Sequence, residues 1–118
     1  MKFMSFNCRG LAGPLKRSTL KRVVCCGHHD IILLQATLGH GEEVKAWLDI
    51  FFYGWRLEAL DVRGRSGGLA VGWNPRTIKE RNVWGMYSIL GLSCSALELD
   101  VEFIILNVSG PYHDKAPF

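Results

Sequence analysis

Carboxamide side chains close three apolar segments of the chain. Asn7 ends the segment 2–7, Gln35 ends the segment 30–35, and Asn107 follows the apolar run 103–106. Mixed sheets tend to place chemistry at the carboxyl ends of their strands. A carboxamide offers a neutral oxygen to a hydrated cation and an N–H donor to a phosphate oxygen. Asn7 could therefore contact a hydrated cation or a phosphate group, while a strand-ending Asx turn is the structural alternative.

Basic charge is concentrated in two blocks of the chain. The net charge is +3, from 14 basic and 11 acidic residues. Six of the basic residues precede Asp30, where no acid occurs, and the segment 63–81 is basic again apart from Glu80. Two basic blocks could form a surface that meets phosphate. A solvated helix face and a solvated hairpin would explain the same charges without a ligand.

The apolar pattern predicts the elements that position these residues. Strands are predicted over 2–7, 30–35, 55–59, 69–73, 79–84, 89–99 and 101–108. Helical spacing predicts helices over 15–27 and 41–51, and a glycine-rich hairpin is predicted at 63–68. Strand–helix–strand–helix followed by a meander of strands is typical of an α+β domain with mixed α/β layers. We expect one domain over residues 1–118.

Composition excludes several classes of protein. Hydrophobic residues make up 48% and charged residues 21% of the chain, as in globular proteins rather than disordered ones. No apolar stretch approaches the roughly 20 residues of a membrane helix, and the N-terminus does not read as a signal peptide. An intracellular protein, nuclear or cytoplasmic, is expected. The four cysteines form no C-x-x-C pair, so reduced and mostly buried thiols are expected.

Four stretches, taken in order, resemble the endonuclease/exonuclease/phosphatase superfamily. They are SFNCRGL at 5–11, LLQAT at 33–37, RSGGLA at 65–70 and LNVSGPY at 106–112. The strongest likeness is to the apurinic-type endonuclease domain of plant LINE (non-LTR) retrotransposons, which typically opens with a Ser-Trp-Asn-Cys-Arg-Gly-Leu-like segment. The resemblance covers the whole chain, and its motifs are specific as a set although each is weak alone.

The resemblance implies a magnesium-dependent DNA endonuclease that hydrolyses phosphodiesters. Asn7 matches the family's asparagine that helps to position the metal and the scissile phosphate, and Asn107 matches a second motif position. Arg9, Arg63 and Arg65 are the expected nucleic-acid contacts. For the last two, glycines that permit a tight hairpin are the alternative explanation of the motif.

The chain also departs from this family. Ala36 stands where the family has the glutamate that holds magnesium, and a methyl group cannot replace that ligand. Ala36 could be a natural loss or an engineered change. Ser109 replaces a tyrosine, and the family's later Asp-x-Asn and Asp-His motifs have no counterpart. We therefore expect the N-terminal half of such a domain, without tightly bound magnesium and without activity; the alternative is a non-catalytic module that binds nucleic acid or protein.

The missing half has consequences for architecture and partners. The family fold is a four-layer α/β/β/α sandwich, and half of it predicts one β-sheet with two helices on one face. The other face would expose apolar residues from 31–34 and 103–106. Exposed apolar patches usually find a partner, so a homodimer through this face, or aggregation, is expected. DNA binding is expected to be weak and sequence-independent, and no membrane partner is expected.

Overall fold

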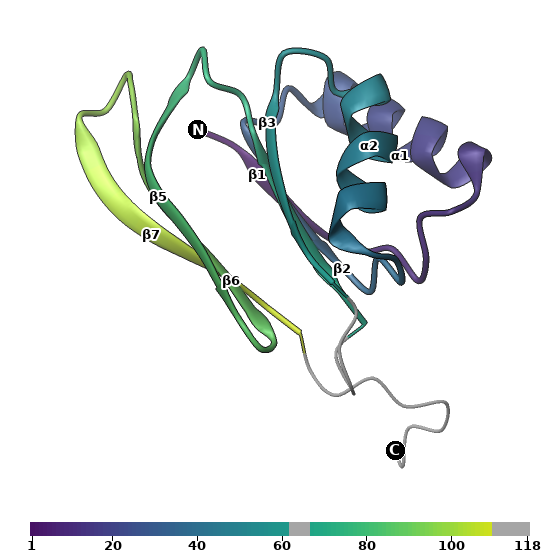
Figure 1. Ribbon diagram of the computed structural model, residues 1–118. Coiled ribbons are helices and arrows are strands. Elements are labelled where there is room, and N and C mark those ends of the chain that lie inside the picture. The colour runs from purple at the N-terminus through teal and green to yellow at the C-terminus, as the bar shows by residue number, and fades with distance from the viewer. Residues whose placement is uncertain (62–66, 110–118) are drawn as a thin grey trace, which may run out of the picture.

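The computed structural model describes residues 1–61 and 67–109 and contains two helices and seven strands in that part of the chain. In chain order these are β1 (Phe3–Asn7), α1 (Pro14–Gly27), β2 (Ile31–Gln35), α2 (Gly41–Phe51), β3 (Arg56–Leu60), β4 (Leu69–Trp73), β5 (Ile78–Met86), β6 (Ile89–Ala96) and β7 (Val101–Val108). Figure 1 shows three layers: the helices at the right, the first sheet in the middle, and the second sheet at the left.

The first sheet has the strand order β1-β2-β4-β3. β1 runs parallel to β2, with Asn7 opposite Gln35, while β4 is antiparallel to both of its neighbours. The four apolar residues of β2 alternate between the two faces of this sheet, and all are buried. Ile32 and Leu34 join the core beneath the helices, whereas Ile31 and Leu33 join the core between the sheets.

Both helices cover the same face of the first sheet (Figure 1). α2 buries Val44 and Leu48 and begins with two acidic residues in its first turn, where the positive end of the helix dipole favours them. α1 begins at Pro14 and buries only Leu20 and Val24. The rest of its apolar stripe, including Leu15, stays in contact with solvent. Neither described helix is long and apolar enough to cross a membrane.

The second sheet is an antiparallel meander in the order β5-β6-β7. A tight turn carries the chain from β4 into this sheet: the Ile78 N–H donates to Asn74 O at 2.9 Å. The Thr77 hydroxyl donates to Asp30 Oδ1 at 2.8 Å, which ties the turn to the start of β2. Residues such as Leu92 then face the first sheet and are fully buried.

The structure confirms the α+β class and the two helices on one face, but the strands form two sheets rather than one. The second sheet covers Ile31 and Leu33, so the expectation that the segment 31–34 is exposed is wrong. For the segment 103–106 the expectation holds in part. Ile104 and Leu106 are 63% and 53% exposed, on the outer face of the second sheet.

One buried thiol lies in each of the two cores. Cys8 belongs to the core beneath the helices, and Cys94 belongs to the core between the sheets. Burial raises the pKa of the Cys8 thiol to about 12, against the opposing effect of the Lys16 ammonium, and raises the pKa of Cys94 to about 11. Cys25 and Cys26 on α1 are exposed, so only half of the thiols are buried as expected.

Candidate functional site

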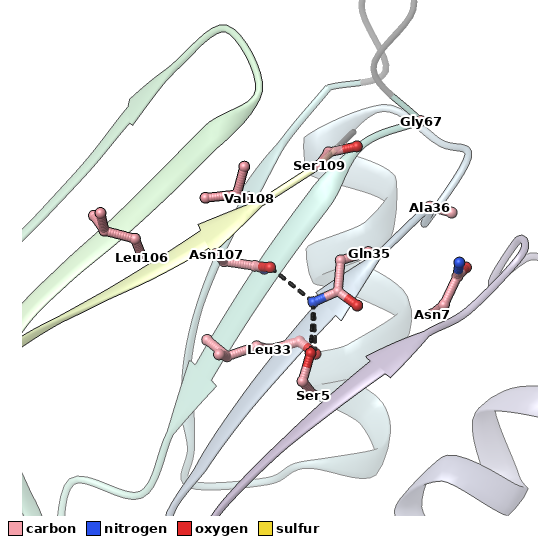
Figure 2. Close-up of a pocket in the computed structure, with 10 residues that line it drawn as sticks. All are labelled: Ser5, Asn7, Leu33, Gln35, Ala36, Gly67, Leu106, Asn107, Val108 and Ser109. Atoms are coloured by element: carbon pink, nitrogen blue, oxygen red, sulfur yellow. Dashed lines mark hydrogen bonds between the residues drawn. The ribbon is translucent and has the colours of Figure 1, made fainter. Parts of the chain in front are cut away.

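An open cleft of about 590 Å³ lies where β1, β2 and β7 end. Its described lining consists of small, polar and apolar residues: Ser5, Asn7, Leu33, Gln35, Ala36, Gly67, Leu106, Asn107, Val108 and Ser109. Figure 2 shows these residues around the cleft. The lining includes all three carboxamides that the sequence placed at strand ends, so the fold brings Asn7, Gln35 and Asn107 together.

Gln35 connects the three strands that meet at the cleft. Its Nε2 donates to Ser5 Oγ on β1 at 2.9 Å and to Asn107 Oδ1 on β7 at 2.8 Å (Figure 2). Gln35 belongs to the motif at 33–37, which predicts no role for it. Parallel pairing of the first two strands is the signal that would have indicated its position. That pairing sets Gln35 opposite Asn7 and diagonally across from Ser5.

Asn107 is a structural clamp between the two sheets. Its side chain is 1% exposed. The Nδ2 group donates to Leu34 O at 3.0 Å and to Ala70 O at 2.9 Å, two carbonyl groups of the first sheet. Together with the bond from Gln35, these contacts use both the donors and the oxygen of the amide. Asn107 therefore fixes the cleft wall, and its amide has little capacity left for a ligand.

Asn7 has a different environment, because its side chain is exposed at the end of β1. Its Oδ1 accepts a hydrogen bond from the Arg9 N–H at 3.2 Å, so the Asx turn that was the structural alternative is present. Figure 2 shows the amide pointing from β1 toward the side of the cleft where Ala36 lies. The turn engages the oxygen, and the same side chain still lines the cleft.

Ala36 lies in the cleft wall in a left-handed backbone conformation, with φ of 53°. Its carbonyl oxygen accepts from the Gly10 N–H at 2.7 Å. Gly67 approaches it from the other side, since a β-carbon added at Gly67 would come within 3.2 Å of the Ala36 α-carbon. The residue in the expected glutamate position thus lies close to two glycine backbones, one of them hydrogen-bonded to it, and its side chain is only a methyl group.

The predicted basic contacts are only partly described. Arg9 is exposed in the loop after β1, with φ of 51°, and does not belong to the cleft lining. Arg63 and Arg65, with the hairpin predicted around them, lie outside the described residues. Lys16 reaches the same loop from α1, and its Nζ donates to Cys8 O at 2.7 Å. This contact ties the loop that carries Arg9 to the helix layer.

The donor set of the cleft does not fit magnesium. Mg²⁺ is usually held through one or two carboxylates, and the described lining offers only amide, hydroxyl and backbone oxygens. In the described part of the chain, no group of three or more His, Cys, Asp or Glu side chains is arranged to hold a metal. Glu42 and Glu43 are exposed in the first turn of α2 and do not line the cleft.

A buried hydroxyl lies next to the cleft loop. Thr37 is fully buried, and its Oγ1 has no hydrogen-bond partner within residues 1–61 and 67–109. An unsatisfied buried hydroxyl costs about 1–3 kcal/mol. We therefore expect Thr37→Val, which keeps the shape, to stabilise the protein by about 1 kcal/mol in urea denaturation. Thr37→Ser keeps the hydroxyl and should not stabilise; a loss of stability in the valine variant would show that the hydroxyl is bonded.

Comparison with solved structures identifies the fold. The chain aligns with humanized D. rerio TDP2 at a TM-score of 0.66 and 11% identity, covering 87% of this chain and 44% of that one. It aligns with the AP endonuclease LMAP from Leishmania major at 0.65 and 17%, covering 90% and 39%. For ANGEL2, a 2',3'-cyclic phosphatase, the values are 0.57 and 12%, covering 88% and 39%.

These three structures have the endonuclease/exonuclease/phosphatase fold, and the chain shares that fold while spanning less than half the length of each. No protein-family model matches the sequence, and no curated protein matches it. The likeness therefore establishes the architecture alone.

Proposed function

We propose that this chain is a non-hydrolysing relative of metal-dependent phosphodiesterases, descended from a LINE-type endonuclease domain, and that its cleft contacts nucleic-acid phosphates without cleaving them. The observation that carries the proposal is Ala36 in the cleft wall, at the position where the resemblance places the metal-binding glutamate. The shared fold supports an origin among nucleases and phosphatases. The motif at 5–11 supports the retroelement origin.

The chemistry of the cleft favours binding over hydrolysis. Asn7 and Ser109 are polar groups at the mouth that could meet phosphate oxygens, and neither is a carboxylate. In-line cleavage also needs a general base and charge stabilisation at the leaving oxygen. The described lining supplies no such base, since its polar side chains are amides and hydroxyls. Magnesium, if it binds, is expected to bind weakly.

The alternative is a module that reuses the same half-fold for a protein partner. Two measurements separate it from the first candidate. Salt-sensitive DNA binding without nicking supports the phosphate-contacting cleft. A DNA affinity that does not change with salt concentration would contradict an electrostatic contact with DNA. Plasmid nicking that depends on magnesium and is abolished by EDTA would show that the chain is an enzyme.

We expect weak, sequence-independent DNA binding that decreases as salt increases. Replacing Arg63 and Arg65 with Glu should weaken binding and reduce the slope of log affinity against log salt by about 1–2, because each phosphate contact contributes about one unit. Fluorescence anisotropy with a short duplex measures both quantities. Replacing Arg76 and Lys79 with Glu changes the net charge equally. Both are exposed near the opposite end of β4, so binding should change less. Equal effects from the two pairs would contradict a localised contact.

A further inference from the structure

β1 is the terminal strand of the first sheet, yet it has the character of an interior strand. It pairs in parallel with β2, and parallel strands are usually covered on both faces. Phe3 faces the sheet-to-sheet side and is 57% exposed, while Phe6 faces the helix side and is 41% exposed. Edge strands that meet water are normally protected by charge, proline or a covering element, and the five residues of β1 contain neither charge nor proline.

An apolar groove adjoins this strand on the helix side. It lies between β1 and α1, has a volume of about 330 Å³, and its lining includes Phe6, Leu15, Leu20 and Val23. Leu15 is 80% exposed and Val23 is 48% exposed. The helical stripe predicted from the sequence is thus wider than the stripe that the first sheet buries. The apolar residues of α1 that the first sheet does not bury lie beside β1.

A second open edge lies on the same side of the molecule. β7 is the terminal strand of the second sheet, and its outward residues Ile104, Leu106 and Val108 form an apolar row that is 53–63% exposed. No described helix covers this outer face (Figure 1). Because Asn107 bonds to carbonyl groups of β2 and β4, β7 lies over those strands, and β1 extends beyond it. The β1 edge of the first sheet therefore projects past the β7 edge of the second sheet. We call the surface formed by these two offset edges the step.

We propose that a second copy of this chain docks on this step, with the β1 edge of each copy beside the β7 edge of the other. β1 and β7 run in the same direction, since both end at the cleft. A two-fold axis parallel to the strands would then set the first sheet of one copy in line with the second sheet of the other. The groove between β1 and α1 would meet the apolar row of β7, twice.

The amount of exposed apolar surface favours a second copy as the occupant. A stable interface buries about 800 Å² per partner. The apolar side chains of the two edges are 41–80% exposed, and they are Phe3, Phe6, Leu15, Val23, Ile104, Leu106 and Val108. At roughly 100 Å² each, these seven reach the area of a stable interface before the strand edges are counted. Leu106 and Val108 also line the cleft, so a docked copy would cover part of the cleft wall and would compete with DNA for it. The dimer itself does not require nucleic-acid binding.

The test uses charge exchange across the proposed contact in the full chain. Leu15→Lys changes the groove, and Ile104→Glu changes the row that the groove would meet. Because each substitution occurs twice in a dimer, we expect each variant alone to raise the dimer dissociation constant at least about tenfold. A mixture of the two variants should recover dimers, since one contact is then native and the other pairs Lys with Glu. Analytical ultracentrifugation over a concentration series measures this, with circular dichroism to confirm folding.

Ile50→Lys is the matched control, because Ile50 is 72% exposed on α2, which packs beside β3 at the far edge of the first sheet. This variant should dimerise like the unmodified chain. A folded but monomeric unmodified chain would overturn the proposal and point to another polypeptide as the occupant. Dimers that persist in both single variants, or a mixture that fails to recover them, would overturn the proposed contact.

Discussion

Asn107→Asp is expected to destabilise the protein by about 3–5 kcal/mol at neutral pH, the cost of an uncompensated buried charge. In the native protein, Nδ2 donates to Leu34 O and Ala70 O in a fully buried environment. A carboxylate in its place would face two carbonyl oxygens and could donate to neither. Chemical denaturation monitored by circular dichroism measures the loss.

The same variant should show a characteristic pH dependence. Burial and the carbonyl oxygens favour the neutral form, so the pKa of the introduced carboxyl group is raised in the folded state. The folded state then binds more protons than the unfolded state. Stability should be highest below the unfolded pKa of about 3.9 and should fall as the pH rises toward the folded pKa.

Asn82→Asp makes the same chemical change at an exposed position on β5. Its effect should remain within about 0.5 kcal/mol, as for most surface substitutions. If Asn107→Asp were as well tolerated as this control, the amide would not be the buried connection between the sheets. The cleft wall would then depend on other contacts.

Ala36→Glu is expected to raise magnesium affinity at least about tenfold without creating nuclease activity. One carboxylate beside a divalent cation contributes about 1–4 kcal/mol in a partly exposed site, and Asn7 and bound waters could complete the shell. Glutamate tolerates the left-handed backbone at this position about as well as alanine does, since both carry a β-carbon. Isothermal titration calorimetry measures the affinity, and plasmid nicking measures the activity.

Ala36→Gln is the control for this substitution. Glutamine has the same length and no charge, so its magnesium affinity should stay near that of the unmodified chain. An equal gain in both variants would mean that the metal is held by something other than a carboxylate. Nicking by the glutamate variant would contradict the conclusion that the cleft lacks further catalytic groups.

Local pattern was sufficient to predict most elements of the fold. α2, β4 and β7 begin and end where apolar spacing placed them. β4 and β7 are bounded by glycine or polar residues that stop the pattern, whereas α2 ends at Phe51 although the aromatic Phe52 follows. β6 ends at Ala96 rather than at 99, since the chain turns over the next residues and Asp100 has a φ of 50°. Turns that rely on tertiary contacts leave little trace in hydrophobicity.

The division into two sheets could not be read from the same pattern. Alternation shows which residues of a strand share a face, and it does not show which strands share a sheet. Here the turn after β4 decides the matter, through a hydrogen bond between Thr77 and Asp30 that joins residues 47 positions apart. A single-sheet expectation follows from the sequence when that contact is unknown.

The site was predictable as a location but not as a set of roles. Asn7 and Asn107 were predicted as site positions from the motifs of the family resemblance, and both line the cleft. The structure then separates them, because one is exposed at the cleft and the other is buried between sheets. The hydrogen bond from Gln35 to Asn107 joins residues 72 positions apart, and it exists only once the second sheet packs on the first.

The two buried thiols give each layer of the protein its own internal reporter. Cys8 becomes reactive only when the helices separate from the first sheet, and Cys94 only when the two sheets separate. Thiolates are the reactive form, and both pKa values are far above neutrality in the native state. Pulsed alkylation followed by peptide mass analysis can therefore time the opening of the two interfaces separately. It would reveal whether the sandwich and the helix layer unfold as one cooperative unit or as two.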